Sequence, residues 1–302
     1  MAIAVRPLLS TLLILVTVVA ATGVPARAAT SAMEELAGPP AATDLHVMTF
    51  NLRFADTASP NSWRDRRPVM RTLLTVEQPD LIGTQEGLAA QLRDIKHDLG
   101  GDYDYIGTPR QAGPGGESMA IFYRLDRLTP QTYGHFWLSD TPEIPGSETW
   151  GGFAVRMVTW ARFLDRATGK RFYAVNTHLD NLSEHARRRA ATLIRARLAA
   201  LDPPLPIILT GDFNTPAQPA GPVHDLLVTQ AGYRDTWITA SVHSAPYGTF
   251  HAYRPLVPNG PRIDWILTTP GVTVSAALIN LYRTGPQYPS DHLPVQVRLR
   301  LP

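Results

Sequence analysis

Residues of the types that bind metals or transfer protons stand at the ends of six otherwise apolar segments of this sequence. In chain order they are Asn51, Glu86, His178 with Asp180, Asp212 with Asn214, Asp264, and Asp291 with His292. A single Asp or Asn after a strand is usually a turn residue. Six such segment ends are hard to explain in that way, so we expect neighbouring strands to bring them into one cleft.

These side chains predict metal-assisted hydrolysis. Several of them offer hard oxygen atoms, and the sequence contains no cysteine, so the set suits Mg²⁺, Mn²⁺ or Ca²⁺ better than a structural zinc. His178 and His292 are acid/base groups with acidic candidates to orient them. A divalent metal with an oriented histidine suits the attack of water on a phosphate ester. The sequence has no G-x-S-x-G nucleophile elbow, and the lack of cysteine excludes a thiol nucleophile.

Short stretches rich in β-branched and aromatic residues precede most of these ends, and they predict strands. The predicted strands cover residues 45–53, 79–86, 117–124, 157–165, 171–180, 206–214, 262–269, 272–282 and 293–300. Residues 66–78 and 183–201 have apolar side chains at helical spacing and predict helices. The fourth and fifth predicted strands should form a hairpin. The two-residue period of a strand should point Asp212 and Asn214 in the same direction.

The beginning of the chain is typical of a secretory leader. Arg6 precedes a long uncharged stretch, and Ala26-Arg27-Ala28 forms an A-x-A pattern, which predicts cleavage after Ala28. A membrane anchor is the alternative, but the strongly apolar part of the stretch is short. We therefore expect a signal peptide at 1–28, a flexible lead-in at 29–44 and a single catalytic domain at 45–302.

Charge and composition limit the partners. The chain has 28 basic and 26 acidic residues, a net charge of +2. The leader contains Arg6 and Arg27 and no acidic residue, so its removal leaves 26 of each. A neutral mature chain gives no electrostatic reason to expect nucleic acid as a partner. With no second long apolar run and no disulfide, we expect a secreted monomer that relies on its own core and does not insert stably into a membrane.

Six motifs in this order, TFNLR, GTQEG, NTHLD, GDFN, RIDW and SDH, resemble the endonuclease/exonuclease/phosphatase superfamily of deoxyribonuclease-like metal-dependent phosphohydrolases. They extend from residue 51 to residue 292. The resemblance implies an α/β fold, a four-layer α/β/β/α sandwich with two mixed sheets packed face to face and helices outside. It also implies divalent-metal-dependent phosphoester hydrolysis. The segments NSWRDRRP, HFWLSDTPEIPGS and VTWARF are most similar to small exported bacterial members.

The resemblance also implies roles for the oxygen-bearing side chains. Glu86 is the implied main metal ligand, with Asn51 beside it. Asp212 is implied to orient the attacking water, and Asn214 to hold a phosphate oxygen or the metal. Asp291 is implied to support the metal or Asp212. The implied metal is Mg²⁺, with Mn²⁺ or Ca²⁺ as alternatives.

The two motif histidines are implied to stand on either side of the phosphate. His292 is the implied general base, or a stabiliser of the pentacovalent phosphorane, with its imidazole held by Asp264. His178 is the implied proton donor or phosphate ligand. Glu117 matches the acid that pairs with this histidine in the deoxyribonuclease branch. Which histidine is the acid and which the base stays open.

Three further residues have weaker sequence signals. Asp180 is a supporting candidate, but it stands next to a predicted helix start and could serve only the turn or the helix dipole. Arg156 could clamp a phosphate or be a solvated arginine. His251 could line the cleft, because it is close in sequence to RIDW, or it could be a packed histidine.

Three functions remain open from the sequence. A small-molecule or headgroup phosphoester is favoured by the neutral charge, by export and by an aromatic wall that could form from Trp137, Trp150 and Phe153. A nuclease would use the arginines at 64, 66 and 67 to follow a nucleic-acid backbone. A non-catalytic binding protein is a third alternative, which the completeness of the motif set argues against.

Overall fold

The structure, a computed structural model, describes residues 1–2, 30–113 and 115–302. The predicted leader and its cleavage site fall in the part that is not described. Within the described residues, no helix is both long enough and apolar enough to cross a membrane.

The first sheet is mixed. Its seven strands lie in the order β10 (Val242–His243), β12 (Thr273–Ile279), β13 (Val295–Arg300), β1 (Leu45–Asn51), β2 (Leu81–Leu88), β4 (Glu117–Arg124) and β3 (Tyr103–Ile106). Strand β1 runs parallel to β2 and antiparallel to β13. The strands β1 and β2 therefore end at the same edge of the sheet, as the convergence of their polar ends requires.

The second sheet is also mixed. Its six strands lie in the order β5 (Leu128–Trp137), β6 (Met157–Asp165), β7 (Arg171–His178), β8 (Ile207–Asp212), β11 (Asp264–Thr268) and β9 (Arg234–Asp235). Strands β6 and β7 pair antiparallel, which confirms the predicted hairpin. Strand β7 is parallel to β8, and β11 is antiparallel to β8, so the ends of β7 and β8 meet the beginning of β11.

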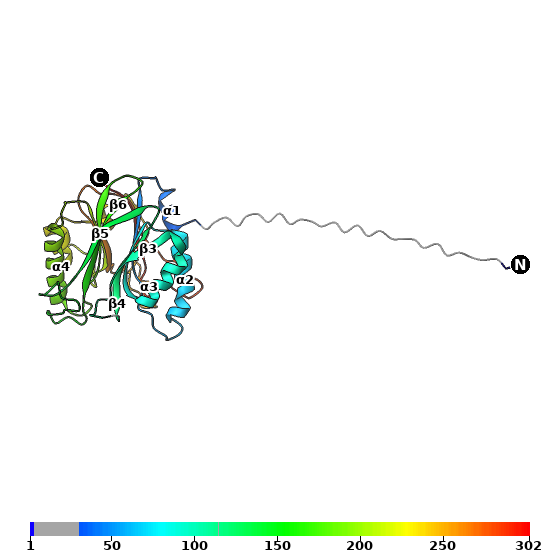
Figure 1. Cartoon of the computed structure of the whole chain (residues 1–302), viewed down its shortest axis with the longest axis horizontal. Helices are drawn as coiled ribbons and strands as arrows, with labels where there is room; N and C mark the ends of the chain where they lie inside the picture. Colours follow the sequence, from blue (N-terminus) through cyan, green and yellow to red (C-terminus); the bar gives the residue numbers. More distant parts are fainter. Residues whose placement is uncertain (3–29, 114) are drawn as a thin grey trace.

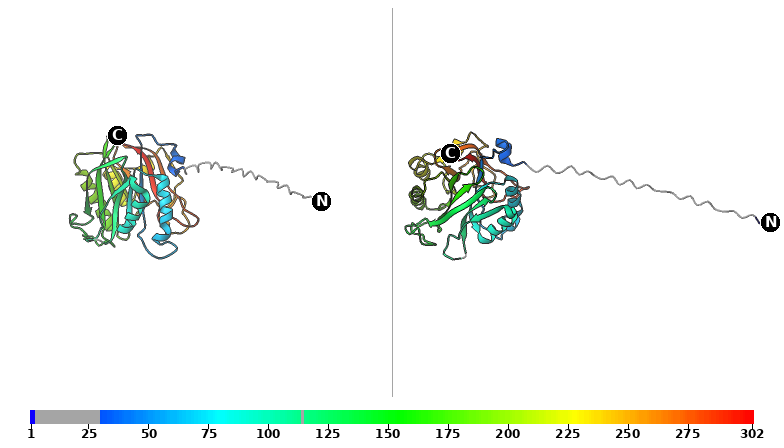
Figure 2. Two further views of the ribbon diagram at one scale, coloured as in Figure 1. Left: turned by 45° about the vertical axis from the view of Figure 1, so that its right-hand side comes forward. Right: turned by 45° about the horizontal axis from the view of Figure 1, so that its top comes forward.

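Three apolar cores hold the layers together. One lies between the sheets and includes Val47, Ile121, Phe163 and Ile208. A second joins the second sheet to α4 (Glu184–Ala199), and a third joins the first sheet to α2 (Trp63–Glu77) and α3 (Ala89–Leu99). Figure 1 shows α4 on one side of the strands and α2 with α3 on the other. The order helix, sheet, sheet, helix confirms the predicted four-layer sandwich, and Figure 2 gives two further views of it.

The sheets approach each other closely at Gly83 of β2. A Cβ atom at this position would lie 2.0 Å from Thr210 Oγ1 and 2.8 Å from Asn176 Oδ1, so only glycine fits. Asn176 of β7 bridges the layers, because its Nδ2 donates to the carbonyl oxygens of Thr84 (2.7 Å) and Ala120 (3.0 Å). These buried hydrogen bonds fix how the two sheets face each other beneath the cleft.

Most predicted strands and both predicted helices are present, with boundaries that differ by a few residues. Part of the predicted flexible lead-in at 29–44 is helical. Residues Ala32–Ala37 form helix α1, which Ser31 caps by accepting a hydrogen bond from the Glu34 N–H. Met33 is fully buried against Ala276 and Leu278 of β12, and this apolar contact orders the segment.

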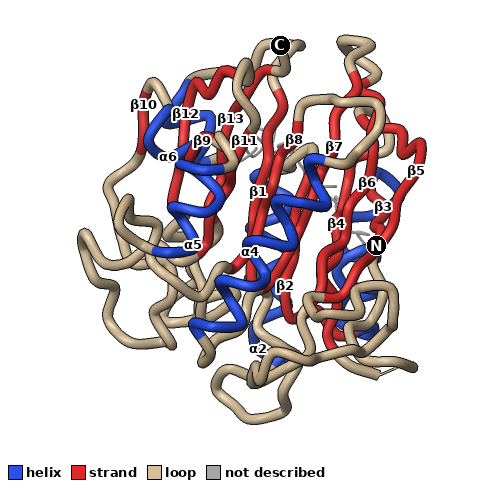
Figure 3. Tube along the Cα trace, turned by 90° about the vertical axis from the view of Figure 1, so that its left-hand side faces the viewer, coloured by secondary structure: helices blue, strands red, loops and turns tan. Residues whose placement is uncertain are grey.

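Most of the remaining elements lie between β8 and β12. They are the short helices α5 (Pro222–His224) and α6 (Thr236–Thr239) with the π-helical turn Asp225–Gln230. A 3₁₀ turn at Gly100–Asp102 follows α3. In Figure 3, α4 crosses in front of the strands and α5 and α6 lie to one side of it. The edge of both sheets opposite the chain's C-terminus is left to loops, and the functional side chains lie there.

Candidate active site

The pairing of the strands brings the motif residues together. The parallel register of β7 and β8 places His178 opposite Asp212, and the antiparallel register of β8 and β11 places Asp264 opposite the same aspartate. Asn51 ends β1, and its side-chain nitrogen reaches across to Asp212 at 3.0 Å. The predicted convergence of strand ends is therefore present, and both sheets contribute to it.

A pocket of about 820 Å³ opens above these strand ends. Eight of the predicted site residues line it: Glu86, Glu117, Arg156, His178, Asp212, Asn214, Asp291 and His292. Asn51 and Asp264 are fully buried directly behind this lining, where they bond to Asp212 and His292. Asp212 and Asn214 both line the pocket, as predicted, but β8 ends at Asp212 and Asn214 has a φ of 50°, so the strand period is not the reason.

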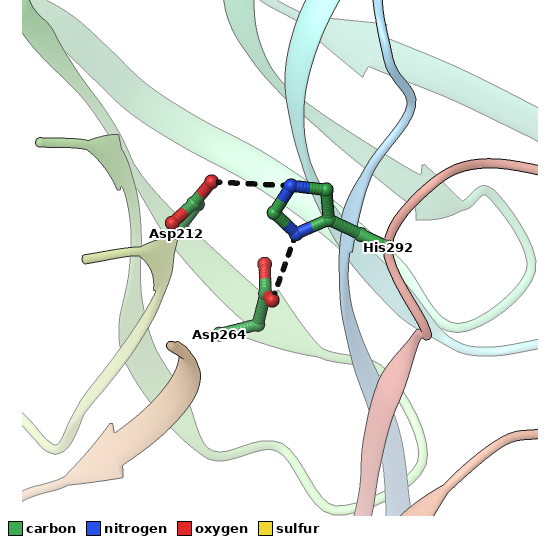
Figure 4. Close-up of side chains that lie close together, drawn as sticks. All are labelled: Asp212, Asp264 and His292. Atoms are coloured by element: carbon green, nitrogen blue, oxygen red, sulfur yellow. Dashed lines mark hydrogen bonds and ion pairs between the residues drawn. The ribbon is translucent and has the colours of Figure 1, made fainter. Parts of the chain in front are cut away.

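His292 stands between two buried aspartates (Figure 4). Its Nδ1 lies 2.9 Å from Asp264 Oδ2, and its Nε2 lies 3.8 Å from Asp212 Oδ2. The backbone is fixed too, because Ser290 Oγ donates to the carbonyl oxygen of Asn51 and accepts from the His292 N–H. The two interactions hold the imidazole in one orientation, with Nε2 turned toward the pocket.

Burial and mutual attraction set the charges of this group. Burial, together with the charge of Asp264, raises the pKa of Asp212 to about 7. Burial disfavours the charged form of His292, but the carboxylates of Asp264 and Asp212 outweigh it and raise its pKa to about 10. His292 is therefore an imidazolium at neutral pH and can bind an anion. Asp212 can exchange a proton near neutrality.

His178 differs in its charge. Burial, followed by the positive charges of Arg156, Arg110 and His292, holds the pKa of His178 well below its usual value. Asn214 Nδ2 donates to the carbonyl oxygen of Leu179 at 3.0 Å and lies 2.9 Å from His178 Nε2. The neutral ring therefore accepts a hydrogen bond at Nε2. The predicted role of proton donor needs a proton that this nitrogen does not hold here.

The opposite wall is acidic. Asn51 Nδ2 donates to Glu86 Oε1 at 2.9 Å as well as to Asp212, and the Phe54 N–H donates to Glu86 Oε2 at 3.1 Å. Asn51 Oδ1 accepts from the Arg53 N–H at 2.9 Å, which sets the orientation of the amide. Asn51 therefore bridges the carboxylates of Glu86 and Asp212, and its oxygen faces the Arg53 N–H.

Comparison with known proteins agrees with this geometry. The model of the endonuclease/exonuclease/phosphatase family matches residues 48–292, from β1 to His292. The chain belongs to this family. Its members hydrolyse phosphoesters, so the predicted family and enzyme class are confirmed.

Solved structures of the family resemble the chain over most of its length. An endonuclease/exonuclease/phosphatase family protein from Bacteroides thetaiotaomicron is 34% identical, with a TM-score of 0.80 over 86% of this chain and 98% of that one. The mannosyl-6-phosphatase of Bacteroides thetaiotaomicron VPI-5482 is also 34% identical, with a TM-score of 0.78 over 84% of this chain and 99% of that one.

A curated relative covers less of the chain. An uncharacterized protein of Acanthamoeba polyphaga mimivirus is 30% identical over 164 residues, which is 51% of this chain. The match spans 59% of the viral protein's length.

Glu117 departs from the pairing that the family resemblance implied. Glu117 Oε2 lies 2.8 Å from Arg110 Nη1, and Glu117 does not pair with His178. Among the described residues, His178 Nδ1 has no hydrogen-bond partner. The side chains of Arg110 and Glu117 lie close together because their backbones pair, with the Arg110 N–H donating to the Glu117 carbonyl oxygen.

Asp180 serves the scaffold. Its Oδ1 accepts from the N–H groups of Leu182 and Ser183 at the start of α4, and its Oδ2 accepts from those of Phe153 and Ala154. Asp180 is 2% exposed and lies behind the pocket lining. Asp180 therefore serves the turn and the start of α4, which was the alternative to a role in the site. It also holds the loop at 153–154, which closes one side of the pocket.

Of the alternatives for the pocket wall, His251 follows the packed one and the aromatic wall is incomplete. His251 is 5% exposed and packs against the ring of Tyr288 at 4.5 Å, so it lies behind the wall rather than in it. Its Nδ1 accepts from the Tyr253 N–H. Trp137 and Trp150 are buried and do not line the pocket, and of the predicted aromatic wall only Phe153 does.

Other lining residues were not predicted: Arg53, Arg110, Phe54, Phe250 and Tyr253. None lies in a motif at a strand end except Arg53 in TFNLR, so spacing alone gives little signal for them. Phe250 packs on the His292 ring at 4.9 Å and shares a β-bridge with it. The sequence signal that could have identified this contact is the nearness of GTFHAY to RIDW.

Proposed function

We propose that this protein is a secreted, divalent-metal-dependent hydrolase of a small organic phosphoester. One observation carries the proposal: a single pocket joins the imidazolium of His292, the carboxylate of Asp212 and two buried arginines, Arg110 and Arg156. Positive groups around a carboxylate that can accept a proton suit the hydrolysis of a phosphate ester.

Glu86 and Asp291 are the residues that would hold the metal. Both line the pocket, and the negative charge of Glu86 helps burial to raise the pKa of Asp291, although His292 opposes the rise. One or two carboxylates with waters and a phosphate oxygen are the usual surroundings of Mg²⁺, so the donor set fits this ion. A cation held there would neutralise negative charge on the phosphate.

The cluster of Asp212, Asp264 and His292 is a second group whose atoms lie close enough to hold an ion. Its hydrogen bonding favours proton transfer instead, because His292 Nδ1 is engaged by Asp264. Asp212 Oδ1 accepts from the Asn214 N–H, and its Oδ2 accepts from Asn51 and faces His178 and His292. In the proposed reaction Asp212 orients water and accepts its proton, and His292 binds the negative charge that develops on phosphate.

The pocket suits a substrate with a compact organic group. Its volume of about 820 Å³ is well beyond what a phosphate alone occupies and falls in the usual range for small-molecule sites. Three of its lining residues are exposed phenylalanines, Phe54 (44%), Phe153 (69%) and Phe250 (51%). Their rings offer apolar contact to the carbon skeleton of a leaving group. The similarity to a mannosyl-6-phosphatase makes a sugar phosphate the first candidate.

The nuclease alternative loses its strongest sequence support. Arg66 is fully buried and donates to backbone carbonyl oxygens, among them Leu52 at 2.7 Å. Arg67 is paired with Asp94 at 2.7 Å and Asp98 at 2.8 Å. Of the three arginines in that segment, Arg64 alone is exposed, and one exposed arginine gives little electrostatic attraction for a nucleic-acid backbone.

We also propose that the protein is exported with removal of residues 1–28 and acts as a monomer. The leader pattern supports export.

A substrate panel on residues 29–302 with Mg²⁺ tests the function. It contains hexose 6-phosphates, inositol phosphates, sphingomyelin, p-nitrophenyl phosphate, plasmid DNA and poly(A) RNA. We expect the highest kcat/KM for a small phosphoester, and a value about 10²- to 10⁴-fold lower in a His292→Ala control. Faster cleavage of DNA or RNA than of every small ester would refute the proposed substrate class.

A further inference from the structure

Two arginines form one wall of the pocket. Arg110 lies in the loop between β3 and β4, and Arg156 immediately precedes β6. They are 8% and 7% exposed, and both line the pocket beside His178. A guanidinium is rarely buried to this extent unless an anion or several acceptors surround it.

The partners of these arginines differ. Arg110 forms an ion pair with Glu117 at 2.8 Å, but among the described residues its Nε and Nη1 atoms have no hydrogen-bond partner. Arg156 Nη2 donates to the neutral amide oxygen of Asn181 at 3.0 Å, and its Nε lies 3.9 Å from Asp180 Oδ2. That Asp180 oxygen already accepts two backbone hydrogen bonds.

Arg156, like Arg110, has unused donors, and its nearest carboxylate is farther away. Within the described residues, its Nε and Nη1 atoms are buried without a hydrogen-bond partner. The positive charges of Arg156 and Arg110 also act on His178, because together with burial they lower the pKa of this histidine. A buried cation with two unused N–H donors beside a catalytic pocket needs an anionic ligand.

We propose that Arg156, assisted by Arg110, binds the terminal oxygens of a phosphate monoester and makes this enzyme a monoesterase. This inference rests on the proposed function and adds the class of ester. In the reaction, the water oxygen bonds to phosphorus, the phosphorus–oxygen bond to the leaving group breaks, and the leaving oxygen takes up a proton. The products are an alcohol and inorganic phosphate.

The distinction between esters follows from charge and geometry. A monoester phosphate has three non-bridging oxygens and a charge of about −1.5 to −2 near pH 7. A diester has one oxygen fewer and a single negative charge. Its second ester arm would stand where a charged oxygen is needed, and the arginine donors would stay unpaired. A site built to bond a group that a competitor lacks discriminates strongly against that competitor.

The test compares two esters with the same leaving group, p-nitrophenyl phosphate and methyl p-nitrophenyl phosphate. We expect Arg156→Gln to lower kcat/KM about 10- to 100-fold for the monoester, because a charge-assisted hydrogen bond is lost. For the diester, kcat/KM should fall less than about threefold. The control is Arg64→Gln, an exposed arginine on α2 outside the pocket, which should change neither value. An equal loss on both esters would overturn the inference.

A second measurement does not depend on the variant folding. Inorganic phosphate should inhibit the wild-type enzyme competitively and raise its thermal unfolding temperature, and Arg156→Lys should weaken both effects. Absence of phosphate binding by the wild type at 10 mM, or a wild-type preference for the diester, would also overturn the inference. Failure of the proposed function looks different, because then neither ester is hydrolysed with any divalent metal.

Discussion

The hydrogen bond between Asp264 and His292 is the interaction on which the assigned chemistry depends most directly. Asp264 is fully buried, its Oδ2 lies 2.9 Å from His292 Nδ1, and it does not line the pocket. If it acts only by orienting and charging His292, then Asp264→Asn should lower catalysis without altering substrate contacts. The asparagine has nearly the same shape, so the fold should be retained.

The size of the effect follows from the interaction that is lost. A hydrogen bond to a charged partner contributes about 1.5–3 kcal/mol. At about 1.36 kcal/mol for each factor of ten, Asp264→Asn should lower kcat/KM about 10- to 150-fold. His292→Ala removes the imidazolium itself and should cost about 10²- to 10⁴-fold.

A double-mutant cycle measures whether the two residues act as one unit. We would determine kcat/KM for the preferred phosphoester with wild type, both single variants and the double variant, and check folding by urea unfolding. The double variant should be no less active than His292→Ala alone, because Asp264 has nothing left to orient. Multiplicative losses would refute the assignment, since Asp264 would then act by another route.

Three further predictions address the metal, the packing and the pH dependence. Chelation with EDTA should abolish activity and Mg²⁺ should restore it; full activity in EDTA would exclude the metal assignment. Glu86→Gln should raise the Mg²⁺ concentration that gives half of the maximal activity at least about tenfold. Gly83→Ala should lower the free energy of unfolding by about 1–3 kcal/mol or more, because the new Cβ would lie 2.0 Å from Thr210 Oγ1. Gly101→Ala is the control and should change this free energy little, because no atom lies near its Cβ. Urea titration measures both values. Burial lowers the pKa of His46 to about 4, below the 6.5 of an unfolded histidine, so the free energy of unfolding should fall as the pH drops from 6.5 toward 4. His46→Gln should reduce this fall and the exposed His97→Gln should not; equal pH profiles would contradict the reasoning.

The sequence predicted best the strands that are rich in buried apolar residues. The predicted strands at 117–124 and 157–165 agree with β4 and β6 in both boundaries. Strand β5 (Leu128–Trp137) was not predicted, because it is an edge strand with many half-exposed residues, a Pro and a Gly. Helix α1 depends on the burial of a single side chain, Met33, and such a contact has no periodic signal.

Some residues of the candidate site were also predictable from the sequence, and others were not. Side chains at strand ends, such as Asp212 and His292, were predictable because a polar residue there interrupts an apolar pattern. Arg110 and Arg156 stand in loops, and an arginine in a loop is solvated by default. Only the fold shows that both are buried, and only the geometry shows that Glu117 pairs with Arg110 instead of His178. The sequence thus indicates the acid/base chemistry better than the groups that select the substrate.

Strained backbone conformations are concentrated at the pocket. Seven non-glycine residues of the described chain have positive φ, and five of them line the pocket: Arg53 (51°), Glu86 (63°), Asn214 (50°), Ala252 (48°) and Tyr253 (58°). Such conformations cost free energy and persist where the surrounding structure enforces them. At Glu86 the enforcing bonds come from Asn51 and from the Phe54 N–H, and at Asn214 they come from Asp212 and Leu179. Since Glu86 and Asn214 are held by their neighbours in the site, the strain at these two residues serves the placement of their side chains, and the rest of the sandwich must stabilise it.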